Sequence, residues 1–233
     1  MTLKTPEECE RAVLDYIEKH YNDYTEQEIN YTKKNLPYLQ KNKNLATIRT
    51  PHFLRQIYDE LGIIPDNENM YHGFVRLLEE KMDINRDVIE TASGIIPNVA
   101  RRVALRQKSG SITSYDPRLT VHTSVLPNMI IKRENFTSKT KVKSNSLLIG
   151  FMPCEATIDI IESATINNAD FMIGLCEGGS RRNFGWLEYD DEWLGFVDSY
   201  ARSRLSKRED VTLETASLSD YGDPYPVIYT KHK

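Results

Sequence analysis

The stretch that decides the fold runs from residue 88 to residue 118 and reads VIETASGIIPNVARRVALRQKSGSITSYDPR. Two short apolar segments at its ends, Val88–Glu90 and Ser111–Tyr115, predict strands. Between them lie a turn over residues 91–94 and a helix that we expect near 97–108. The second strand stops at Asp116, and an acid ~20 residues beyond such a turn typically accepts hydrogen bonds from ribose hydroxyls. The unit therefore predicts a nucleoside or phosphate site.

Length and composition describe a globular protein. The chain has 233 residues, of which 39% are hydrophobic and 27% charged, so it can bury one substantial core, with or without a helical appendage. A net charge of −4 gives no general attraction to nucleic acid or to an anionic membrane. We therefore expect neither partner.

The sequence also predicts a cytoplasmic location. No apolar run approaches the ~20 residues that span a bilayer, and the first residues, MTLKTPEECERAV, lack the apolar segment of a signal peptide. The three cysteines, Cys9, Cys154 and Cys176, fit reduced thiols better than a disulfide framework.

The first 85 residues carry helical signals and no convincing strand, which predicts an N-terminal helical domain over residues 1–85. Thr5 followed by Pro6 is a good helix start, and further helices are expected over Pro51–Leu61 and Asn67–Met82. The polar, tyrosine-rich stretch 22–50 is expected to contain helix and loop, without clear bounds.

From residue 87 onward, short apolar runs alternate with helical segments, which is typical of parallel strands joined by crossover helices. Three more strands are expected within this second domain, residues 86–233, at Met129–Lys132, Ser146–Met152 and Phe171–Leu175. Helices are expected near 155–168 and 189–205.

The end of the chain breaks this alternation. Two further strand candidates, Val211–Leu218 and Val227–Lys231, are separated only by the eight residues SDYGDPYP. Eight residues cannot hold a helical crossover, so these two strands should pair antiparallel.

With that hairpin, residues 87–233 resemble the class I S-adenosylmethionine-dependent methyltransferases. VIETASGIIP resembles the first family motif, SYDP the second, and LLIGFMPCEAT the fourth. The resemblance implies an α/β fold: a Rossmann-like seven-stranded methyltransferase sheet with an antiparallel C-terminal hairpin, preceded here by the helical domain. It implies S-adenosylmethionine as the cofactor.

The resemblance also implies roles for individual residues. Glu90 and the backbone of the turn would face the amino-acid part of the cofactor, Asp116 would accept hydrogen bonds from both ribose hydroxyls, and Pro153 would line the site of methyl transfer. The cofactor-binding set is Glu90, Ala92, Ser93, Gly94, Asp116, Pro117, Met152 and Pro153. Ala92 replaces the usual first glycine of the turn and Met152 replaces an acid found in many amine-methylating members. The alternative is that no ligand binds here. Gly94 would then be needed only for the tight turn after the first strand, and Asp116 would cap the turn that Asp-Pro opens after the second strand.

Two acids are candidate catalytic residues. Glu155 and Glu177 follow the fourth and fifth strands, so they should meet at the carboxyl edge of the sheet and could accept a proton from a substrate amine or hydroxyl. Glu155 is equally suited to the first turn of a helix. Cys154 and Cys176 precede these acids, but no zinc-ligand spacing accompanies them, and we expect no metal.

The segment 177–186, EGGSRRNFGW, is either a substrate loop or an ordinary surface loop. The sequence favours a methyltransferase acting on a small molecule, with a homodimer left open. A non-catalytic protein that binds S-adenosylmethionine or another nucleoside on a degenerate methyltransferase fold is the first alternative. A nicotinamide-dependent oxidoreductase is the second, and the C-terminal hairpin disfavours it.

Overall fold

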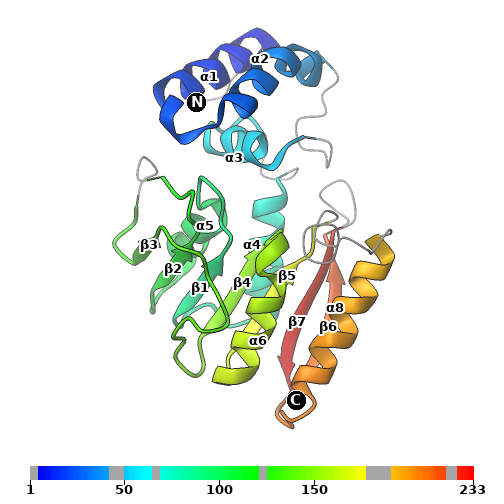
Figure 1. Ribbon diagram of the computed structural model, residues 1–233. Helices are drawn as coiled ribbons and strands as arrows, with labels where there is room; N and C mark the ends of the chain where they lie inside the picture. The colour runs from blue at the N-terminus through cyan, green and yellow to red at the C-terminus, as the bar shows by residue number, and fades with distance from the viewer. Residues whose placement is uncertain (1–4, 42–49, 65–68, 121–124, 177–189, 219–224) are drawn as a thin grey trace.

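A seven-stranded sheet forms the centre of the molecule (Figure 1). The computed structural model describes residues 5–41, 50–64, 69–120, 125–176, 190–218 and 225–233. The strands follow the order β3-β2-β1-β4-β5-β7-β6 across the sheet. Their bounds are β1 Val88–Thr91, β2 Ile112–Tyr115, β3 Met129–Lys132, β4 Leu147–Phe151, β5 Asp170–Gly174, β6 Val211–Ser217 and β7 Pro226–His232.

The pairing confirms the mixed sheet expected from the sequence. Strands β1 to β5 are parallel, whereas β7 runs antiparallel to both β5 and β6 and lies between them. Ile173 of β5, for example, pairs with Ile228 of β7. The predicted C-terminal hairpin is therefore confirmed.

Helices cover both faces of the sheet. Because successive side chains of a strand point to opposite faces, Leu147 and Ile149 of β4 pack towards α4 and α5, and Leu148 packs towards α6 and α8. The bounds of these helices are α4 Met70–Lys81, α5 Asn98–Arg106, α6 Thr157–Asn167 and α8 Asp190–Leu205. Within the described ranges, no helix has both the length and the apolar character needed to cross a membrane.

Three N-terminal helices lie beyond the carboxyl ends of the parallel strands (Figure 1). They are α1 Pro6–Lys19, α2 Glu26–Lys41 and α3 His52–Glu60, with the short 3-10 helix η1 Tyr21–Asp23 between the first two. Their apolar cluster includes Ile95 and Ile96 from the connection after β1. Helix α4, in contrast, packs on the sheet itself. The division of the chain at residue 85 stays a prediction.

Helix α2 occupies much of the stretch 22–50, where the sequence predicts helix and loop without clear bounds. It begins at a reciprocal cap in which the Glu28 backbone N–H donates to Thr25 Oγ1 at 3.2 Å and the Thr25 backbone N–H donates to the Glu28 carboxylate at 2.9 Å. Thr5 and Glu8 form the same arrangement at the start of α1. Both helices thus begin at a capping box.

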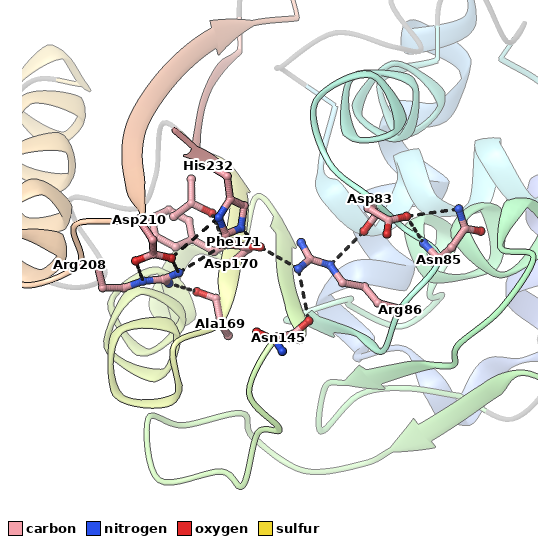
Figure 2. Close-up of polar contacts among 11 residues, drawn as sticks. Asp83, Asn85, Arg86, Asn145, Ala169, Asp170, Phe171, Arg208, Asp210 and His232 are labelled. Carbon is pink, nitrogen blue, oxygen red and sulfur yellow. Dashed lines mark hydrogen bonds and ion pairs between the residues drawn. The ribbon is translucent and has the colours of Figure 1, made fainter.

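The opposite, amino-terminal edge of the sheet is held by a buried carboxylate (Figure 2). Asp170, at the start of β5, accepts hydrogen bonds from Arg86 Nη1 at 2.7 Å and from His232 Nε2 at 3.0 Å. Burial opposes its ionisation, but the hydrogen bonds from Arg86 and His232 outweigh that effect and lower the pKa of Asp170. This contact ties the segment before β1 to β5 and to the end of β7.

Candidate functional site

A cavity of about 680 Å³ opens at the carboxyl ends of β1, β2 and β4. The strand order reverses between β1 and β4, and in open α/β sheets ligands bind at such a switch point. The volume lies within the roughly 300–1,000 Å³ of small-molecule sites. Six of the eight predicted cofactor-binding residues line it, together with one of the two predicted acids: Ala92, Gly94, Asp116, Pro117, Met152, Pro153 and Glu155.

The glycine turn and Asp116 are joined directly. Gly94, at φ +76°, donates its backbone N–H to Asp116 Oδ2 at 2.9 Å, and the Arg118 backbone N–H donates to Asp116 Oδ1 at 2.8 Å. The carboxylate therefore closes both the turn after β1 and the turn after β2. Each carboxylate oxygen can accept about two hydrogen bonds, so Asp116 keeps acceptor capacity for a ligand hydroxyl.

Ala92 adopts a left-handed conformation, with φ +52°. This conformation brings its β-carbon close to its own carbonyl oxygen and is unfavourable by about 1–2 kcal/mol in an L-residue. Ala92 is half-buried and its side chain lines the cavity. The turn thus has the backbone shape that glycine favours, although alanine occupies the position.

Glu90 lies behind the cavity wall rather than in it. It is 2% exposed and accepts a hydrogen bond from Ser114 Oγ at 2.6 Å. Burial raises the pKa of Glu90 to about 7, against the lowering effect of hydrogen bonds from Ser114 and from the Ala100 backbone. Ser93 is also buried and does not line the cavity. Glu177 lies outside the described residues, as does the segment 177–186.

The chain leaves β4 through a strained turn. Met152 and Cys154 have φ +57° and +41°, with Pro153 between them, and the Met152 backbone N–H donates to the Gly174 carbonyl at 2.8 Å. The 3-10 helix η3 Cys154–Ala156 follows and leaves Glu155 exposed at the cavity edge. Left-handed non-glycine residues of this kind gather at functional sites, where the surroundings hold them in place.

The ends of β4 and β5 meet as the sequence predicts. The Sγ atoms of Cys154 and Cys176 lie 2.7 Å apart, and both residues line the cavity. Within the described ranges, no three His, Cys, Asp or Glu side chains come together in an arrangement that could hold a metal ion.

The sequence missed the contribution of α3. Gln56 Nε2 donates to the carbonyls of Ser93 and Ile96, each at 2.6 Å, and its Oε1 accepts the Ile95 backbone N–H at 3.2 Å. A single buried side chain thus satisfies three backbone groups of the glycine turn. No signal in the sequence marks it, since Gln56 lies 37 residues before Ser93.

Helix α3 is also fixed to α5. Asp59 is buried and receives a bidentate ion pair from Arg102, with N–O distances of 2.7 and 2.6 Å. Asn69 and Asn98 also donate to the Asp59 carboxylate, and Arg101 pairs with Glu60. The position of α3 over the cavity is therefore set by charged contacts as well as by apolar packing.

Arg55, next to Gln56, lines the cavity from the same helix. It is 6% exposed, and its Nη1 donates to the Tyr225 hydroxyl at 3.0 Å. Its other contacts are the thioether sulfurs of Met70 and Met152, at 3.4 and 3.6 Å. Of the residues that the structure describes, those that accept hydrogen bonds from this buried guanidinium are all neutral, and they lie at the β4–β7 side of the cavity.

No protein-family model matches this chain, and no curated protein matches it. Among solved structures it is similar to the magnesium protoporphyrin IX methyltransferase of Synechocystis with bound S-adenosylhomocysteine, at 8% identity over 88% of this chain and 97% of that one, with a TM-score of 0.49. It is also similar to the precorrin-6y C5,15-methyltransferase of Geobacter metallireducens, at 10% identity over 70% of this chain and 88% of that one, with a TM-score of 0.45. A third similar structure, a 23S rRNA methyltransferase, has 17% identity over 68% of this chain and 66% of its own, with a TM-score of 0.44.

Because these likenesses are weak, the strand order decides the fold. The parallel run β3-β2-β1-β4-β5, with β7 inserted antiparallel between β5 and β6, is the arrangement implied by the sequence motifs and the C-terminal hairpin. The chain has the Rossmann-like fold of the class I S-adenosylmethionine-dependent methyltransferases.

Proposed function

We propose that this protein is an S-adenosylmethionine-dependent methyltransferase acting on a small molecule. The observation that carries the proposal is the contact between Asp116 and the glycine turn at the switch point of this sheet. It supports the proposal because it places a carboxylate with remaining acceptor capacity beside a left-handed turn, at the edge of a cavity of suitable size.

The residues present fit a nucleoside. Tyr115 lines the cavity and contacts the Phe136 ring edge-to-face at a centroid distance of 5.6 Å, which gives an apolar surface next to Asp116. Asp116 would accept hydrogen bonds from the ribose hydroxyls. Three carboxylates, Asp116, Glu155 and Asp159, line the cavity together with Arg55 and Arg118, and Arg118 pairs with Glu28. Near the carboxylates, the lining favours a group that carries positive charge, as a sulfonium does.

When bound, the cofactor would supply an electrophilic methyl group on a sulfonium sulfur. The chain would orient the acceptor for in-line attack, which supplies much of the rate in such reactions. Glu155 is exposed at the cavity edge, where it could take the proton that the acceptor nitrogen or oxygen loses. Glu177 remains the second candidate for that role.

A non-catalytic binding protein is the second candidate. The left-handed Ala92 places a methyl group in the cavity wall, and Met152 offers a thioether where many amine-methylating members have an acid. Both features are compatible with cofactor binding and offer no group to the chemical step. The nicotinamide alternative is disfavoured by the antiparallel β7.

Titration calorimetry with S-adenosylmethionine, S-adenosylhomocysteine and NADH tests the proposal. We expect the first two to bind, and Asp116→Asn to weaken both by about tenfold or more, since a hydrogen bond to a charged group contributes about 1.5–3 kcal/mol. Asp198→Asn is the matched control, because Asp198 lies on α8, pairs with Arg202 and does not line the cavity. Transfer of labelled methyl to a small-molecule extract then separates an enzyme from a binding protein. Binding of NADH alone would overturn the proposal.

A further inference from the structure

The energetically unusual residue of the cavity is Arg55. Removing a guanidinium from water is unfavourable unless a carboxylate or a full set of hydrogen bonds replaces the water. Arg55 is 6% exposed, and within the part of the chain that the structure describes no carboxylate lies within ion-pair distance of it. Its Nε atom is buried and has no hydrogen-bond partner among the described residues.

The other arginines near this region are paired differently. Arg102 makes its bidentate contact with Asp59, and Arg118 pairs with Glu28 at 2.9 Å. Arg55 instead contacts one phenol and two thioethers, and thioether sulfur is a weak acceptor. Among the described residues, the charge of Arg55 is thus left without an anion at a position that lines the cavity.

We propose that Arg55 binds the carboxylate of the methyl acceptor, so that the substrate is a small carboxylic acid. The inference rests on the proposed function, because it assigns the donor to the Asp116 side of the cavity and the acceptor to the Arg55 side. Arg55 contacts Met152, after β4, and Tyr225, before β7, whereas Asp116 follows β2. The two charged groups therefore belong to different parts of the cavity.

The geometry favours a carboxylate in particular. A carboxylate that displaced the weak Met152 contact would reach both Nη2 and Nε, the edge of the guanidinium that forms two parallel N–H···O bonds. Methionine is flexible enough to move aside. A doubly charged phosphate is less suitable, because Asp116, Glu155 and Asp159 line the same cavity and would repel two charges more strongly than one, while the Arg55 guanidinium would neutralise only one of them.

Ligand-detected NMR with matched pairs of probes tests the proposal without the methyl donor. The pairs are benzoate with benzamide and indole-3-acetate with indole-3-acetamide. We expect the protein to bind the acids at least about tenfold more tightly than the amides, Arg55→Met to lose this preference, and Arg55→Lys to keep part of it. If the unmodified protein shows no preference for the acids, or Arg55→Met retains one, the proposal is wrong.

Two further measurements separate this role from others. Thermal unfolding should show Arg55→Met at least as stable as the unmodified protein, because the variant removes a buried charge without a counter-ion. Arg102→Met should be less stable, because it leaves Asp59 without its ion pair, and should keep the preference for acids. An Arg55→Met protein that unfolds would show a structural role and overturn the proposal.

The donor is the competing source of a carboxylate. S-Adenosylmethionine and its decarboxylated analogue should bind with a ratio that Arg55→Met leaves unchanged. If the substitution abolishes discrimination between these two while the acids and amides are bound alike, Arg55 serves the donor. Failure of S-adenosylmethionine to bind, with the acid preference intact, would contradict the proposed function and leave a carboxylate site in place.

Discussion

The Gln56 side chain lies against Gly94 and leaves no room for a β-carbon at position 94. An ideal Cβ built on Gly94 would be 2.6 Å from both the Nε2 and the Oε1 atom of Gln56. Gly94 also has φ +76°, a left-handed conformation that favours glycine. The glycine is thus required twice, once by its own backbone and once by a side chain from α3.

A double-mutant cycle separates these two requirements. Gly94→Ala should lower the free energy of unfolding by about 2 kcal/mol or more, from left-handed strain together with the clash. Gln56→Ala should also destabilise, because it leaves backbone groups of the turn without their partner. In the combined variant the clash is absent, so its loss should be smaller than the sum by about 1 kcal/mol. Chemical denaturation measures all three; simple additivity would mean that Gln56 does not restrict position 94.

Ala92→Gly should stabilise the protein. The substitution removes left-handed strain of about 1–2 kcal/mol and adds about 0.5–1 kcal/mol of backbone entropy to the unfolded chain. We expect the free energy of unfolding to rise by up to about 1 kcal/mol in urea denaturation. Ala100→Gly, within α5, is the control and should destabilise by about 1 kcal/mol or more. Equal destabilisation by both substitutions would show that Ala92 is not strained.

Glu90 should make stability fall as the pH rises. Its pKa is about 7 in the folded protein, because burial disfavours the charged form, against the ordinary value of 4.5. The folded state therefore binds more protons than the unfolded state between these values, and the contribution of Glu90 is lost as the pH rises through 7. Glu90→Gln should gain stability relative to the unmodified protein from pH 5 to pH 8, by an amount on the order of 3 kcal/mol. A difference between the two proteins that does not change with pH would contradict the raised pKa.

Cys154 and Cys176 should oxidise to a disulfide before Cys9 reacts. Hydrogen peroxide would accept two electrons and two protons from the thiols and leave as water, while the Sγ atoms, now 2.7 Å apart, become bonded. Cys9 is an internal control, since burial and the nearby Glu8 carboxylate raise the pKa of its thiol and lower its reactivity. Peptide mapping should find the 154–176 cross-link with Cys9 still alkylatable. Earlier oxidation of Cys9 would count against this prediction.

Much of the sheet could be predicted because its signals are local. Short apolar runs with turn residues between them fix the strands, and a connection of eight residues leaves an antiparallel hairpin as the outcome for the last two. Asp116 was found for the same reason, because it closes a strand at a set distance from a turn. The capping box at Thr25 and Glu28 was an available signal for α2 that the polar composition of the region obscured.

The roles of the buried polar residues of α3 could not be predicted in this way. The apolar residues Leu54, Ile57 and Tyr58 of α3 are buried, but so are the polar residues Arg55, Gln56 and Asp59. The apolar pattern of the helix therefore does not indicate what these polar side chains contact. Their partners lie at distant points of the chain, including Ser93, Arg102 and Tyr225. Only the folded arrangement shows which charge is neutralised and which is not. For Glu90, the position in the motif does not show whether the carboxyl group faces the cavity or lies behind its wall.

Arg55 and Gln56 are adjacent residues of α3 and contact different parts of the site. Gln56 is bonded to the turn after β1, and Arg55 contacts residues next to β4 and β7, so one short helix contacts two parts of the cavity wall. Neighbouring residues of a helix move together, and a ligand that draws Arg55 towards itself would also pull on the carbonyls of Ser93 and Ile96. Linkage then requires that each ligand alter the affinity for the other by the same factor. If a methyl donor binds at the turn and a carboxylic acid binds at Arg55, as we propose, the binding of one would change the affinity for the other through α3.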